Sequence, residues 1–203
     1  MFKKTQELRE KYEEGQNVQQ QHEDETVLAL SGLAIYVGNR CRNVQEKAQA
    51  EIDRVVGSGR LPTFEDQPDL PFLNAVILET LRWNPVASFG VPHVSRHDDV
   101  YEGYFIPKGT SVMANLWGFS RNSKYYTNPS IFDPGRYLKQ PPELDPREFV
   151  FGFGGRICPG KDLAFQDIWI LAASVLWAFE LLGVEGEAAQ LADEDRFLFG
   201  FIK

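Results

Sequence analysis

Apolar residues recur at helical spacing in several stretches of the chain, and each stretch predicts a helix. Residues 26–37 are expected to form a short apolar helix, and residues 44–56 an amphipathic one that ends at a Gly-Ser-Gly turn. A third helix is expected over 71–83, because proline is accepted at its first position and an Asn-Pro pair closes it. The longest helix is expected over 160–182, and residues 61–70 are expected to be a loop.

The remaining segments lack helical periodicity. Residues 1–25 are polar and glutamine-rich, which indicates a solvated helix and linker set apart from a larger unit over 26–203. Turn residues between β-prone runs predict small hairpins over 91–113, and a short helix is expected over 117–126. Residues 128–148 are rich in proline and predict an irregular meander. The expected fold class is therefore mainly α with small β-hairpins.

Charge and cysteine content narrow the function classes. The net charge of −8 argues against nucleic acid as a main partner, because phosphate binding needs a basic face. Two cysteines do not make a disulfide framework, which fits a reducing compartment. The N-terminus is charged from its first residues and predicts neither signal peptide nor anchor. Residues 168–184 are apolar but contain Glu180 and fall short of the roughly 20 residues of a membrane span, so a buried helix and a soluble, cytoplasmic chain are expected.

Residues 151–160, with the sequence FGFGGRICPG, hold the candidate chemistry. They place Cys158 in a glycine-rich loop directly before the long apolar helix, whose N-terminus favours an anionic sulfur. The glycines let the backbone turn tightly and approach a flat ligand. Arg156 is placed to meet an anion on the same ligand. A thiolate with a cationic neighbour on a tight loop suits an axial ligand to haem iron.

Blander interpretations apply to parts of this pattern. Cys41 is expected to be an inert core residue. The glycines also suggest a dinucleotide-binding loop, but Ile157 stands where that motif needs its third glycine.

A pair of opposite charges lies on the helix expected over 71–83. Glu79 and Arg82 are three residues apart and therefore share a face. Many such pairs lie on solvated surfaces, but apolar residues flank this one. Arg136 in the meander is a candidate third member of a buried charge cluster, which persists only when its members satisfy one another.

The loop pattern of Phe151, Gly154, Arg156, Cys158 and Gly160 resembles the haem-binding loop of the cytochrome P450 family. The likeness is greatest to the fungal microsomal type. It implies haem b, iron protoporphyrin IX, with Cys158 as the axial thiolate and metal ligand.

The resemblance also implies roles for other residues. Glu79, Arg82 and Arg136 match the family's structural triad, which locks the meander and holds the cysteine loop. His93 and Arg156 are expected to contact the haem propionates, and Phe151 to pack against the sulfur. The substrate-contacting segment is expected to be Val86, Ala87, Ser88 and Phe89, with residues 197–201 as a second such segment.

The resemblance covers only the C-terminal part of the family's fold, since a full-length member is more than twice as long. The missing part would include the membrane anchor and most of the substrate pocket. The family's distal helix carries an acid and a threonine that deliver protons to dioxygen. Asp24 and Thr26 lack the alanine-glycine pair that precedes those residues, so neither is assigned and no catalytic residue is named.

Two functions stay open from the sequence. The first is a haem-thiolate monooxygenase that takes electrons from an NADPH-cytochrome reductase and inserts one atom of O2 into an apolar small molecule. The family implies the cytosolic face of the endoplasmic reticulum membrane. The second is a non-catalytic fragment or interaction module that keeps only the proximal half of the haem site.

Overall fold

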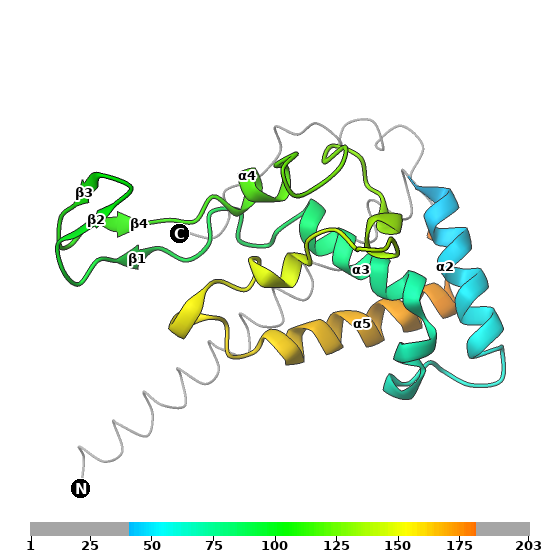
Figure 1. The fold of residues 1–203 in the computed structure, drawn as a ribbon. Helices are drawn as coiled ribbons and strands as arrows, with labels where there is room; N and C mark the ends of the chain where they lie inside the picture. The colour runs from blue at the N-terminus through cyan, green and yellow to red at the C-terminus, as the bar shows by residue number, and fades with distance from the viewer. Residues whose placement is uncertain (1–40, 182–203) are drawn as a thin grey trace, which may run out of the picture.

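The computed structural model describes residues 41–181. Its elements confirm the expected fold class, mainly α with two small antiparallel sheets (Figure 1). The polar segment 1–25, the helix expected over 26–37 and the tail beyond 181 lie outside the described residues. The helices are α2 (Arg42–Val55), α3 (Pro71–Trp83), α4 (Leu116–Ser120) and α5 (Lys161–Ala178); the strands are β1 (His93–Val94), β2 (Asp99–Tyr101), β3 (Tyr104–Ile106) and β4 (Ser111–Val112); the 3-10 helices are η2 (Phe64–Asp69), η3 (Pro134–Tyr137), η4 (Pro146–Glu148) and η5 (Gly154–Arg156).

Helices α2, α3 and α5 pack on one another and enclose the main core. Ala48 and Ile52, one turn apart on α2, are fully buried against them. Trp169 of α5 is also fully buried, and its indole Nε1 donates to Asn74 Oδ1 of α3 at 2.7 Å. Cys41 packs against the same core at the start of α2. Figure 1 shows α2 lying across the C-terminal end of α5.

Helix α5 ends at Ala178, four residues before the predicted end at 182. Side chains of α2 hydrogen-bond the backbone of the residues that follow. Phe179 is extended, and its carbonyl oxygen accepts from Gln49 Nε2 at 2.9 Å. The Gln45 side chain bonds both the N–H and the C=O of Leu181, at 2.9 and 3.2 Å. These bonds replace the continuing helical ones. No helix within residues 41–181 combines the length and apolarity needed to cross a bilayer.

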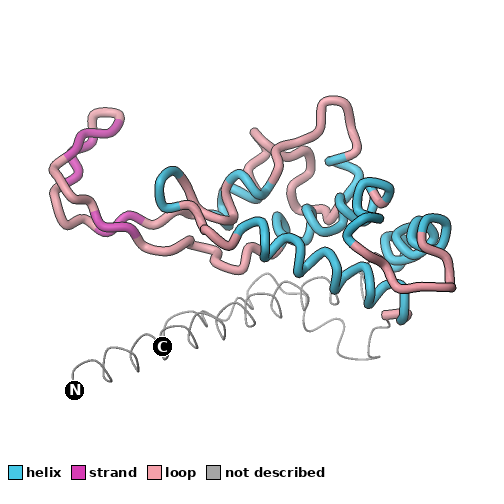
Figure 2. The backbone as a smooth tube through the Cα atoms, turned by 90° about the horizontal axis from the view of Figure 1, so that it is seen from below, coloured by secondary structure: helices cyan, strands magenta, loops and turns pink. Residues whose placement is uncertain are grey.

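The strands form an arm that extends from the helices (Figure 2). β2 and β3 make the hairpin at its tip, and β1 pairs with β4 at its base, with His93 opposite Val112. α4 stops at Ser120, short of the predicted end at 126. Asn122 Oδ1 accepts from the Lys124 N–H at 2.9 Å, and this turn competes with helix.

The predicted loop over 61–70 contains η2, which a single carboxylate organises. Asp66 accepts two hydrogen bonds from the Arg60 guanidinium, at 2.6 and 2.7 Å, and one from the Thr63 N–H at 2.8 Å. These bonds, Arg60 first, hold the pKa of Asp66 far below its usual range despite its burial.

Trp169→Ala should lower the free energy of unfolding by about 3–5 kcal/mol, since it empties a buried site. Urea unfolding followed by circular dichroism measures the change. Leu163→Ala on the same helix is the control: Leu163 is 59% exposed, and its loss should change stability by less than about 0.5 kcal/mol. Equal losses in the two variants would show that the core is wrongly placed.

Acid should remove the stability that Asp66 contributes. Because the pKa of Asp66 is lower in the folded than in the unfolded state, its contribution is complete above the unfolded value of about 3.9 and is lost as pH falls below it. Asp66→Asn should be less stable than the wild type at neutral pH, and the difference should shrink on acidification. Melting temperatures from pH 7 downwards test this, with the exposed Asp53→Asn as control. A constant difference contradicts the assignment.

Candidate functional site

A buried carboxylate on α3 meets two guanidinium groups. Glu79 and Arg82 are both fully buried, and Arg82 donates from Nη2 to Oε1 and from Nε to Oε2, each at 2.8 Å. Arg136 of η3 is equally buried and donates from Nε to Glu79 Oε2 at 3.1 Å. The structure thus brings together the three charged residues singled out in the sequence. Burying them without this pairing would be costly in free energy.

Further donors of the two arginines go to main-chain oxygens at the end of α4 and in the irregular segment between α4 and η3. Arg82 Nη1 donates to Ser120 O (2.8 Å) and Pro129 O (2.9 Å), Arg136 Nη1 to Thr127 O (2.9 Å), and Arg136 Nη2 to Ile131 O (2.9 Å). The carboxylate in turn accepts from the Asp133 N–H at 2.8 Å. The cluster therefore fixes a backbone that has no regular hydrogen-bond ladder of its own.

Two residues that the sequence did not reveal extend the cluster. The Tyr137 hydroxyl donates to Glu79 Oε2 at 3.2 Å, and burial raises its pKa far above its usual range. Glu143 Oε2 accepts from Arg136 Nη1 at 2.6 Å. Burial alone would raise the pKa of Glu143, but hydrogen bonds from Arg136, Lys139 and Thr127 lower it. Both residues lie in the aperiodic meander, where no spacing rule marks an inward-facing side chain.

The cysteine loop folds back on itself just before α5. The Cys158 N–H donates to Phe151 O at 2.8 Å and closes the loop around η5. Gly152 and Gly154 adopt φ values of 81° and 58°, a region that other residues rarely enter. At Gly160, an added Cβ would lie 3.9 Å from Cys158 Sγ. The thiol is partly exposed, two residues before the glycine that caps α5.

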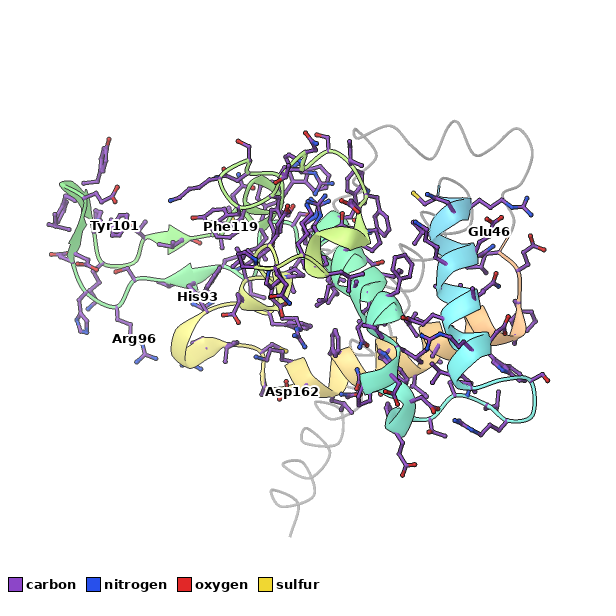
Figure 3. All side chains as sticks on the ribbon, turned by 45° about the vertical axis from the view of Figure 1, so that its right-hand side comes forward. Glu46, His93, Arg96, Tyr101, Phe119 and Asp162 are labelled. Carbon is purple, nitrogen blue, oxygen red and sulfur yellow. The ribbon has the colours of Figure 1, made fainter. Side chains whose placement is uncertain are left out.

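The residues around the thiol fit a haem group. Arg156 is exposed beside it, and His93 is exposed on β1, the strand of the arm nearer to the η5 loop in Figures 1 and 3. Within residues 41–181 neither side chain has a hydrogen-bond or ion-pair partner, so both are available to an anionic ligand. Phe153 and Ile157 of the loop are 48% and 40% exposed and offer apolar surface. A partly exposed thiol, a guanidinium and an imidazole without partners among the described residues, and apolar surface suit the donor set of haem.

Two candidates from the sequence remain: Phe151, at the start of the loop, and the segment 86–89, which follows α3. Phe151 is half-buried and packs against the main core. The segment from Val86 to Phe89 leads from α3 into the arm; the Gly90 N–H donates to Ala87 O at 2.9 Å and closes a turn. Phe89 is 41% exposed at this turn. The expected contacts of Phe151 with the sulfur and of the 86–89 segment with substrate stay predictions.

A cavity of about 530 Å³ opens elsewhere, between η2, α3, η4 and the start of α5. Its lining includes Arg147, Lys161 and Gln166 but no residue of the cysteine loop. Arg147, four residues before the loop, is paired with Asp145, with Nη2 to Oδ2 at 2.6 Å. Its guanidinium also lies 4.7 Å from the Phe165 ring centroid. Arg147 thus joins the meander to α5 and contributes little net charge.

Comparisons with known proteins agree on one family. The sequence model of the family Cytochrome P450 matches residues 25–202. The chain is 39% identical to the cytochrome P450 monooxygenase ppsD of Aspergillus oryzae, over 93% of this chain and 40% of that protein. It is 48% identical to the monooxygenase claR of Ampulloclitocybe clavipes, over 68% of this chain and 26% of that protein. A zebrafish cytochrome P450 structure with progesterone superposes with a TM-score of 0.71 and 32% identity, covering 77% of this chain and 36% of that one. The chain therefore spans less than half the length of these relatives.

Glu79→Gln should destabilise the chain strongly, since it removes the charge that two buried guanidiniums share. Removing one partner of a buried ion pair lowers the free energy of unfolding by about 3–5 kcal/mol. Urea unfolding gives the value. The same change at Glu46 is the control: its pair with Arg42 is exposed (Figure 3), and the loss should stay below about 0.5 kcal/mol. A Glu79→Gln variant as stable as the control would contradict the buried cluster.

Proposed function

Because the chain belongs to the cytochrome P450 family, we propose that it is the C-terminal portion of a haem-thiolate monooxygenase. The single observation that carries the proposal is the thiol of Cys158, held partly exposed in a closed glycine-rich loop at the start of α5. In this role Cys158 would hold the iron of haem b through its sulfur. The likeness to monooxygenases of fungi supports the reaction class.

Each site residue then has a task defined by its place. Cys158 lies two residues before Gly160, the N-cap of α5, and would supply the sulfur ligand. Arg156 and His93 hold the two propionates, since both side chains are exposed and lack partners among the described residues. Gly154 and Gly160 would leave room for the group, since an added Cβ at Gly160 would lie 3.9 Å from Cys158 Sγ, and Phe151 packs against the main core.

When bound, haem supplies the one-electron and dioxygen chemistry of the reaction. The chain itself would hold the group, with the Cys158 sulfur as an electron-rich ligand of the iron. The buried cluster of Glu79, Arg82 and Arg136 holds the meander that leads into the loop. No residue of the chain is assigned as a proton donor.

Substrate, electron donor and location belong to the same proposal. The substrate is an apolar small molecule, with Val86, Ala87, Ser88 and Phe89 as contacts at the turn that leaves α3. The electrons come from an NADPH-cytochrome reductase, and the working site is the cytosolic face of the endoplasmic reticulum membrane. Family membership and the fungal relatives support this part.

Haem reconstitution tests the proposal. The reduced carbon monoxide complex of the wild type should show the strongly red-shifted Soret band of thiolate-ligated haem. Cys158→Ser should abolish the shifted band, because a hydroxyl does not supply the anionic sulfur. Cys41→Ser is the matched control and should keep the band, since Cys41 packs at the start of α2.

Two results of this experiment would contradict the proposal. A shifted band that survives in Cys158→Ser overturns the ligand assignment. No haem uptake by the wild type contradicts a working haem site in this chain and favours a fragment that keeps only the fold of the proximal half.

A further inference from the structure

We propose that Glu143 is a positioning residue for the cysteine loop, a proposal that rests on the proposed haem-thiolate function. It holds the last stretch of the meander against the buried cluster, so that removal of its charge loosens Cys158 before the helical core is affected. The role has three grounds: the contacts of the carboxylate, the charge of the cluster, and the short path from Glu143 to the loop.

Glu143 is held to the same arginine twice. Its Oε2 accepts from Arg136 Nη1 at 2.6 Å, and its backbone N–H donates to Arg136 O at 3.2 Å. The carboxylate also accepts from the Thr127 N–H and from Lys139 Nζ, each at 3.2 Å. These contacts close the part of the meander between Arg136 and Glu143. The side chain is 12% exposed, so solvent weakens the pairing little.

Charge balance requires a second carboxylate here. Glu79 carries one negative charge, whereas Arg82 and Arg136 carry one positive charge each, so these three buried groups sum to one positive charge. Adding Glu143 brings the sum of these four groups to zero; Lys139, which also pairs with Glu143, is 49% exposed, so solvent screens its charge. An uncompensated buried charge is strongly destabilising, and a neutral glutamine at this position would leave one.

A short, bonded path leads from Glu143 to the thiol. The next residue, Leu144, accepts through its carbonyl oxygen from the buried Tyr126 hydroxyl at 3.0 Å. Asp145 then caps η4, and Arg147 lies over Phe165 of α5. After the buried Phe149 the chain enters the cysteine loop. Leu144, Phe149 and Val150 also pack together in a second apolar cluster with Tyr126, so the path from Glu143 to the loop is continuous, packed chain.

Hydrogen exchange on the haem-free chain tests the proposal. The Cys158 amide, which bonds Phe151 O at 2.8 Å, reports on the loop, and the amide of Ala48 in α2 reports on the core. We expect Glu143→Gln to lower protection about tenfold at Cys158, with no change at Ala48, because local opening and global unfolding are separate events. Glu148→Gln is the matched control: Glu148 is exposed on η4, a few residues further along, and should change neither amide.

A second variant guards against misfolding. Glu143→Asp keeps the charge but shortens the side chain, so it should lower protection at Cys158 by a smaller factor than Glu143→Gln. If Glu143→Gln does not fold, Glu143→Asp decides: lower protection at Cys158 alone supports the proposal, and wild-type protection overturns it. Equal loss at Cys158 and Ala48 in a folded variant overturns it as well, since the role is then structural only.

The haem-bound form gives an independent reading. In the reduced carbon monoxide spectrum, Glu143→Gln should lower the ratio of thiolate-ligated to other haem about tenfold relative to Glu148→Gln. A ratio equal to the control contradicts the positioning role. If the wild type takes up no haem, the proposed function fails, while the exchange experiment still decides the role of Glu143.

Discussion

The described part of this chain depends on the buried ion pairs that the Glu79 carboxylate makes with Arg82 and Arg136. Two guanidinium groups share it in the interior, and a buried charge is tolerated only with such compensation. Further donors of the arginines bond carbonyl oxygens of Ser120, at the end of α4, and of Ile131, in the aperiodic segment before η3. The ion cluster thereby supplies the backbone hydrogen bonds that an aperiodic segment cannot form with itself. The irregular chain becomes a fixed support rather than a loop.

That support explains how the cysteine loop keeps its shape beside a core it scarcely touches. The loop is mostly exposed, and its own backbone bonds are local, such as those from the Ile157 N–H to Gly154 O and from the Cys158 N–H to Phe151 O. Its two ends are better fixed. On the N-terminal side, the meander is held by the buried Arg136 and by Arg147, which packs on Phe165. On the C-terminal side, α5 is anchored by Trp169, which is buried in the core. Because both ends of the loop are fixed, its exposed part can offer a thiol and the Arg156 side chain, which has no partner within residues 41–181, to a ligand.

Local signals in the sequence were sufficient where the chain itself decides its structure. Pro71 and the Asn-Pro pair after Trp83 marked both ends of α3, and the glycine-rich motif placed Cys158 at the start of α5. Distant partners decide the rest. The end of α5 depends on Gln45, which lies 136 positions from Leu181, and no local pattern reports such a bond. Glu143 was missed for the same reason, since its partner is chosen by the folded meander.

A double-mutant cycle between Glu79→Gln and Arg136→Gln tests the central claim most directly. If the two side chains are paired in the interior, either change should destabilise the chain and the two together should cost less than their sum. Urea unfolding of the four proteins should give a coupling free energy of about 2 kcal/mol, within the range for residues in one buried network. Additive effects, with coupling below about 0.5 kcal/mol, would contradict the account.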